Sequence, residues 1–210
     1  MIRAHGLQYT YMAGTPLAVP ALLGVDLEIA RGEALGIAGP SGAGKSTLVQ
    51  HFNGLLRPSV RGQLWIDGAD MADPGVDVRR LRQRIGLVFQ RPEDQLFQPL
   101  VGDDIAYGPR QMGLPREEVR ERVRAAMELV DLDFESFKDR PILSLSGGER
   151  RRAAIAGVLA LEPEVLILDE ATSGLDPRGR RSLLDLVCRL HREQGKTIVL
   201  VASQIGRASC

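Results

Sequence analysis

A glycine-rich segment near the N-terminus has the residue types and spacing of a phosphate-binding loop. The stretch GPSGAGKST, Gly39–Thr47, follows an apolar run and precedes a helical pattern. Glycines let successive backbone N–H groups curl around an anion, and the start of the following helix adds partial positive charge. In such a loop Lys45 can reach the β- and γ-phosphates of a nucleotide, and the Ser46 hydroxyl can ligate Mg²⁺. The predicted nucleotide-binding residues of this loop are Gly39, Ser41, Gly42, Ala43, Gly44, Lys45, Ser46 and Thr47.

A pair of acids follows a second apolar run. In VLILDEATSGLD, Val165–Asp176, the carboxylates of Asp169 and Glu170 stand at the C-terminal end of a predicted strand. This end of the strands is where open α/β sheets bind ligands. Asp169 can hold Mg²⁺ directly or through water, and Glu170 can orient and deprotonate the water that attacks a γ-phosphate. An isolated Asp-Glu pair is more typical of a strand that ends in solvent, but beside a phosphate loop it predicts catalysis.

The segment Ser146–Glu149, SGGE, which we call the signature segment, opens another helical pattern. Free N–H groups at the start of a helix predict a second anion-binding site, built from Ser146, Gly147 and Gly148. One chain would rarely build two phosphate cradles for one nucleotide. The signature segment is therefore a candidate second site, distinct from the phosphate loop.

The elements that must position these residues alternate between strands and helices. Four apolar runs lack alternation and predict central strands that helices cover on both faces. They are Leu35–Ala38, Ile85–Phe89, Val165–Leu168 and Thr197–Ala202, and a further strand is predicted at Val25–Ile29. Helices are predicted at Lys45–Leu55, at Arg116–Val130 and after the cap and first-turn proline Asp176-Pro177. The pattern predicts an α/β fold with a mostly parallel sheet and a helical insert at about residues 98–161.

The composition of the chain argues against several classes of function. The chain has 210 residues, 27 basic and 27 acidic, so it lacks the basic surplus typical of a nucleic-acid partner. No apolar stretch reaches the roughly 18–20 residues needed to span a bilayer, and the N-terminus lacks the apolar core of a signal peptide. If the protein works at a membrane, another chain must supply the spanning helices. His5, His51 and His191 have no neighbouring ligand set, which favours surface or packing roles over metal binding.

The stretch LSLSGGERRRAAIAGVLALEPEVLILDE, Leu143–Glu170, resembles the ATP-binding-cassette (ABC) ATPases, and the resemblance covers Ile2–Ser203. It implies a P-loop NTPase fold with an N-terminal antiparallel β subdomain and an inserted α-helical subdomain. It also implies that two subunits pair head to tail, with ATP between one chain's phosphate loop and the other's signature segment. Further roles are implied by the same resemblance: Tyr11 stacks on adenine, Gln90 contacts Mg²⁺ and the attacking water, and Asp176 signals between the paired sites.

Two stretches, VFQRPEDQLF and RRAAIAGVLALEPEVLILDEATSGLDPRGR, look like the second ATPase of energy-coupling-factor importers, which take up vitamins and transition-metal ions. The resemblance implies a transport-coupled ATPase, peripheral at the cytoplasmic face of the membrane. Its partners would be a second, identical or different ATPase, a transmembrane coupling subunit and a substrate-binding membrane subunit. Pro92–Phe97 would dock on the coupling subunit; alternatively, Leu96 and Phe97 pack under the helical insert. Ala171 and Glu149 depart from the proline and glutamine of many relatives without removing a catalytic group.

Two segments keep more than one interpretation. The triple Arg150–Arg152 is either a solvated first helical turn or a holder of phosphate charge across the dimer. At residue 204, where the resemblance implies a histidine that contacts the γ-phosphate, the chain has Gln204. Because Gln204–Cys210 reads like one frame of a sequencing adapter, we interpret 204–210 as a cloning or assembly scar. Residues 1–203 would then be a C-terminally truncated ATP-binding domain that binds ATP but turns it over weakly.

Two other functions remain alternatives to the importer ATPase. A cassette ATPase that acts on DNA or ribosomes without a membrane partner would typically carry long coiled-coil or basic insertions, and the sequence contains neither. A truncated nucleotide-binding module could pair with another copy and show little turnover.

Overall fold

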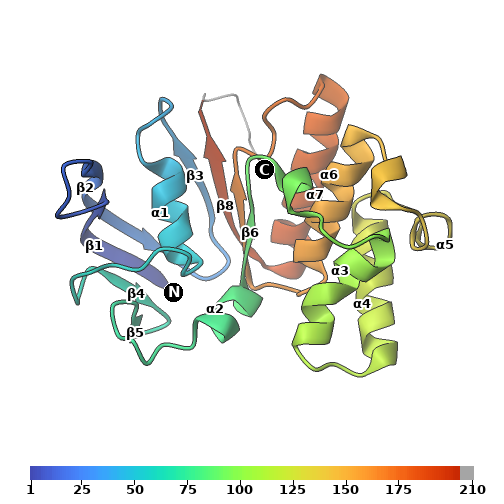
Figure 1. The fold of residues 1–210 in the computed structure, drawn as a ribbon, viewed down its shortest axis with the longest axis horizontal. Helices are drawn as coiled ribbons and strands as arrows, with labels where there is room; N and C mark the ends of the chain where they lie inside the picture. The colour runs from blue at the N-terminus through green and yellow to red at the C-terminus, as the bar shows by residue number, and fades with distance from the viewer. Residues whose placement is uncertain (204–210) are drawn as a thin grey trace.

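The computed structural model describes residues 1–203, and the interpretation of Gln204–Cys210 as a scar concerns residues outside that range. Two four-stranded sheets and a group of helices make up the described chain (Figure 1). One sheet is parallel and the other antiparallel, and most helices lie between or beside them. The predicted fold class, an α/β P-loop type with an antiparallel β portion and an inserted helical portion, is confirmed.

The parallel sheet carries the strand ends at which the acids were predicted. Its strand order is β3-β8-β7-β6, with strands at Ala34–Ala38, Thr197–Ala202, Val165–Asp169 and Ile85–Val88. Every residue of β6 and β7 is buried, as the unbroken apolar runs predicted. Parallel register aligns the C-terminal ends of the strands, so Asp169 pairs with Val201 of β8. The phosphate loop and the two acids therefore leave the sheet at the same edge.

The prediction that β3 is covered on both faces is wrong. Its residues alternate between exposed and half-buried, although Leu35 and Ile37 do pack against the apolar core. β3 stands at the end of the strand order, so within residues 1–203 only β8 pairs with it. An apolar run cannot reveal whether its strand is central or at an edge.

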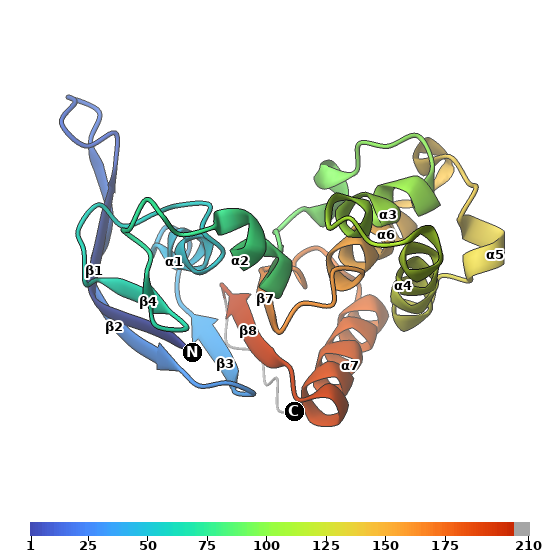
Figure 2. The same ribbon diagram turned by 90° about the horizontal axis from the view of Figure 1, so that it is seen from below.

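The antiparallel sheet has the order β2-β1-β4-β5. Its strands are β1 (Ile2–Tyr11), β2 (Val19–Ile29), β4 (Leu64–Ile66) and β5 (Ala69–Asp70). The predicted strand Val25–Ile29 is the second half of β2. Helix α1 (Lys45–Phe52) lies between the two sheets (Figures 1 and 2), and its fully buried Val49 and Phe52 join a shared apolar cluster. Helix α2 (Val78–Arg84) then leads into β6.

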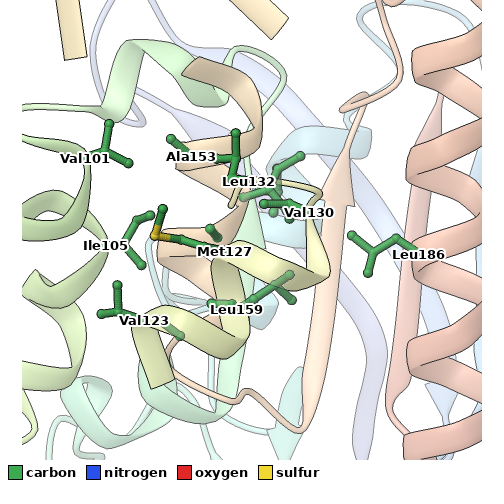
Figure 3. Close-up of a cluster of buried hydrophobic side chains, with 14 of the residues drawn as sticks. Val101, Ile105, Val123, Met127, Val130, Leu132, Ala153, Leu159 and Leu186 are labelled. Carbon is green, nitrogen blue, oxygen red and sulfur yellow. The ribbon is translucent and has the colours of Figure 1, made fainter. Parts of the chain in front are cut away.

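The helical portion lies between β6 and β7 in the chain. It comprises the short 3₁₀ turn η1 (Pro92–Gln95), α3 (Val101–Gln111), α4 (Arg116–Leu129), α5 (Phe134–Phe137), the 3₁₀ turn η2 (Ile142–Ser144) and α6 (Gly147–Leu159). Figure 3 shows side chains of α3, α4 and α6 directed at one another, among them Ile105, Met127 and Leu159. The long α7 (Pro177–Gln194) packs beside them, and its Leu186 joins the same cluster.

The helix predictions hold with small shifts at the ends. α1 stops at Phe52, three residues early, because Gly54 adopts a left-handed φ of 70°. α7 begins after Asp176, whose side chain accepts a hydrogen bond from the Gly179 amide at 2.9 Å, so the predicted cap is present. Among residues 1–203, no helix has the length and apolarity to cross a membrane.

Candidate functional site

The phosphate loop connects the end of β3 to the start of α1. Gly42 and Gly44 take φ values of 82° and 83°, which only glycine adopts without strain. At Gly44 a Cβ atom would lie 2.4 Å from the carbonyl oxygen of Ala21 in β2. The antiparallel sheet therefore presses directly against the loop, and glycine is required there for space as well as for conformation.

Lys45 is folded back over the loop. Its Nζ donates hydrogen bonds to the carbonyl oxygens of Gly39 at 2.9 Å and Pro40 at 3.0 Å. The same Nζ lies 3.5 Å from Oε1 of Glu170, and the lysine side chain is only 7% exposed. A cation held this way, in a loop that also presents backbone amides, is placed to receive phosphate charge.

Asp169 is the last residue of β7 and is 3% exposed. Burial raises the pKa of its carboxyl, and the charge of Glu170 raises it further, while a hydrogen bond with Ser46 and the charge of Lys45 oppose the rise. Oδ1 of Asp169 is buried and has no hydrogen-bond partner within the described range. A buried carboxylate oxygen without a partner, beside a serine hydroxyl, has the chemistry that a hard divalent cation would satisfy.

Glu170 and Gln90 meet across the ends of two neighbouring strands. Gln90 follows β6 and its Nε2 donates to Oε2 of Glu170 at 3.2 Å. Glu170 has a positive φ of 50°, which is uncommon for a residue other than glycine and frequent at functional sites. The structure thus brings Lys45, Gln90 and Glu170 together, although they are far apart in the sequence.

Tyr11 is the last residue of β1 and lies beside α1. The sequence did not predict its contacts there. Its hydroxyl lies 3.1 Å from Oγ1 of Thr47, and its ring meets Tyr9 edge to face with centroids 5.0 Å apart. Tyr9 in turn meets His51 at 4.7 Å, and Nδ1 of His51 lies 2.7 Å from the Thr47 carbonyl oxygen. These contacts fix the exposed Tyr11 ring beside the phosphate loop.

The signature segment lies apart from this cluster. Figures 1 and 2 show α1 and α6 on either side of the parallel sheet. Ser146 caps α6 by accepting from the Glu149 amide at 3.3 Å, and Glu149 accepts from the Ser146 amide at 2.7 Å. This capping box gives the glutamate a local role. Gly148 and Asp176 line one cavity of about 160 Å³, so these two predicted residues are neighbours.

Of Leu96 and Phe97 in the segment Pro92–Phe97, only Leu96 packs under the helical portion as the alternative interpretation expected. Leu96 packs against the core of the helical portion, whereas Phe97 is 61% exposed. The Phe97 ring meets Tyr107 of α3 edge to face at 4.9 Å. Nearby, Arg151 is buried and paired with Glu93, so the arginine triple is not a wholly solvated turn.

Comparison with known proteins settles the family. The sequence profile described as ABC transporter matches residues 22–173. The chain is 55% identical, over 94% of its length and 68% of the relative's, to the energy-coupling factor transporter ATP-binding protein EcfA2 of Symbiobacterium thermophilum. The chain belongs to the ABC transporter family, among its energy-coupling factor ATP-binding proteins. Both resemblances predicted from the motifs are confirmed.

Solved structures place this cassette in the same group. One is cbiO1 from Clostridium perfringens, part of the ABC transporter complex cbiONQ, with a TM-score of 0.82 and 41% identity over 97% of this chain and 78% of that one. Another is a dimeric post-hydrolysis state of the ATP-binding cassette MJ0796 bound to ADP and Pi, with a TM-score of 0.85 and 30% identity over 97% and 88% of the two chains. The cassette is thus a nucleotide-binding domain of a family whose solved members include dimers.

Proposed function

We propose that this cassette binds Mg²⁺-ATP and hydrolyses it to ADP and phosphate as the ATPase subunit of an energy-coupling-factor importer. The observation that carries the proposal is the meeting of Lys45, Gln90 and Glu170 at one edge of the parallel sheet. Phosphoryl transfer to water uses a cation that pairs with phosphate, a group that orients the water and a carboxylate that can accept a proton.

The phosphate loop Gly39–Thr47 would hold the triphosphate through backbone amides and Lys45. Ser46, Asp169 and Gln90 would hold Mg²⁺, and the unpartnered Oδ1 of Asp169 supports this assignment. When bound, the ion neutralises charge on the β- and γ-phosphates. Tyr11 would stack on adenine, a role that its position at the end of β1 supports.

Glu170 would act as general base toward the attacking water, and Gln90 would orient that water. Glu170 contacts both Lys45 and Gln90. When Lys45 turns to phosphate, the carboxylate loses one of these partners and becomes available to accept a proton. The Gln90 amide is already in place to align the base.

A second ATPase chain would complete the site. Ser146, Gly147 and Gly148 at the start of α6 would bind the γ-phosphate held by the partner's loop, and Asp176 would transmit the state of one site to the other. Residues 1–203 would form this ATP-binding domain, with its helical portion at about 98–161. The separation of α1 and α6 by the parallel sheet supports pairing over closure within one chain.

Pro92–Phe97 would dock on a transmembrane coupling subunit, with a separate membrane subunit binding the vitamin or transition-metal ion. The exposed Phe97–Tyr107 pair and the acids of η1 support a docking role for this segment. The cassette would then work as a peripheral protein at the cytoplasmic face of the membrane.

Two substitutions test the chemistry. Lys45→Ala should abolish binding of a fluorescent ATP analogue, because the loop loses its phosphate-binding cation.

Glu170→Gln should keep nucleotide affinity, lower phosphate release by a factor of about 100 or more and favour an ATP-bound dimer. Normal phosphate release by Glu170→Gln would show that the base is a different residue.

A further inference from the structure

Arg151 is the second residue after the signature segment, and its side chain extends from α6 to contact three other segments of the chain. Its side chain is only 11% exposed. Nε lies 3.2 Å and Nη2 lies 3.5 Å from the two carboxylate oxygens of Glu93 in η1. The carboxylate of Glu93 is itself only 23% exposed, so water screens this ion pair less than one on the surface.

The same guanidinium also contacts backbone on both sides of the catalytic cluster. Nη2 donates to the carbonyl oxygen of Gln90 at 3.3 Å. Nη1 donates to the carbonyl oxygen of Ser173 at 2.8 Å and lies 3.5 Å from that of Ala171. One side chain therefore contacts the segment that carries Gln90 and the turn that follows Glu170.

Only arginine can make this set of contacts. Its guanidinium offers five N–H donors in a fixed planar fork, whereas lysine presents three donors on one rotating atom. Burial raises the pKa of Glu93, but a hydrogen bond to its own amide and the hydrogen bond and charge of Arg151 outweigh it, so this pKa lies below its usual value. The carboxylate is thus kept charged opposite Arg151.

We propose that Arg151 is a positioning residue that locks the signature helix α6 to the docking segment Pro92–Phe97. Through its backbone contacts it also fixes the position of Gln90 and of the turn after Glu170. A push by the membrane partner on Pro92–Phe97 would then move the signature segment and the catalytic cluster together. This inference deepens the proposed function and rests on it for the identity of the docking segment.

Arg152 provides a matched control on the same helix. It is the next residue of the arginine triple and its side chain is exposed. A substitution there changes the charge of α6 by the same amount as one at Arg151, but it leaves the junction intact. Any effect seen only at Arg151 belongs to the buried contacts.

Hydrogen–deuterium exchange on the complete chain without nucleotide tests whether Arg151 holds these two segments in position. Arg151→Gln should speed amide exchange about tenfold in both 90–97 and 171–176, because charge-assisted hydrogen bonds to each are lost. Glu93→Gln should loosen 90–97 alone, since Ser173 keeps its bond to Arg151. Arg152→Gln should change neither segment. If Arg151→Gln does not fold, Arg151→Lys should show the same two-segment pattern at smaller amplitude.

A second readout separates positioning from mere support of the fold. In the Glu170→Gln background, Arg151→Gln should weaken ATP-driven dimerisation about tenfold. Affinity of the monomer for fluorescent ATP should change by less than about twofold, because Arg151 does not contact the phosphate loop. The inference would be overturned if Arg151→Gln weakened dimerisation and the monomer's affinity for ATP equally. It would also be overturned if the faster exchange were confined to α6 or uniform over the chain.

The two proposals fail in different ways. If the cassette neither binds nor hydrolyses ATP, the proposed function is wrong, while the exchange pattern still reports the Arg151 contacts. If turnover is normal and the exchange of both segments is unchanged in Arg151→Gln, only this inference is wrong.

Discussion

At the scale of residues, the proposed catalytic groups contact one another. Lys45 is bonded to its own loop and lies close to Glu170, which also accepts from Gln90. Phosphate and water would replace these internal contacts with contacts to substrate. The pairing of Lys45 with Glu170 therefore limits the cost of burying these two charges.

His51 makes the stability of the phosphate-loop helix depend on pH. It is fully buried; burial lowers its pKa, and its hydrogen bond to Thr47 opposes the change only in part. The unfolded chain binds the proton more readily, so stability is full above the unfolded pKa of about 6.5 and declines as pH falls below it. The decline continues until the lower folded pKa is reached, at no more than about 1.4 kcal/mol per pH unit.

His51→Gln should flatten this dependence. Urea unfolding at intervals from pH 8 to pH 5 should show a smaller loss of unfolding free energy in the variant than in the unchanged chain. His5→Gln, at an exposed position on β1, controls for the removal of a histidine as such. A slope that is the same in the chain with His51 and in His51→Gln would contradict the buried neutral state of this ring.

At the scale of elements, the contact between the phosphate loop and β2 joins the two sheets. Gly44→Ala should lower the free energy of unfolding by about 2–4 kcal/mol, because it combines a strained φ with a Cβ 2.4 Å from Ala21. Gly42→Ala has the same sign of φ and open space around the Cβ, so it should cost only about 1–2 kcal/mol. Equal costs in denaturant unfolding would mean that β2 yields to the added methyl group.

Elements with a strong local signal were predictable from sequence. The phosphate loop has a fixed spacing, β6 and β7 are unbroken apolar runs, and α7 carries its cap at Asp176. The exposure of β3 was not predictable, because it depends on which strands pair beside it. The antiparallel sheet was expected only from family resemblance, since the register of β1 against β2 shifts at several points along the pair.

The residues of the candidate site were predictable from the sequence, but the contacts between them were not. Motifs identified Lys45, Asp169 and Glu170 because their chemistry fixes residue type and spacing. The contacts of Arg151 link positions 58 to 61 residues away with others 20 to 22 residues away in the chain. No local pattern encodes such a junction, and an arginine within a run of three resembles a solvated helix face.

At the scale of the whole molecule, the two predicted anion-binding features, the loop before α1 and the cap of α6, lie on either side of the parallel sheet (Figure 2). Head-to-tail pairing would bring the phosphate loop of one chain against the cap of α6 in the second chain, and the same contact would form in reverse. ATP would therefore be bound between two chains, and neither chain alone would close the site.

Complementation between two inactive variants measures this claim directly. In the Glu170→Gln background, Lys45→Ala removes the phosphate loop's function and Ser146→Arg blocks the signature segment. Each variant alone should fail to retain labelled ATP through gel filtration. A mixture should form dimers that retain ATP, because one of the two sites then combines an intact loop with an intact Ser146. The account is contradicted if the mixture retains no more ATP than its parts, or if Ser146→Arg alone traps ATP as well as the Glu170→Gln parent.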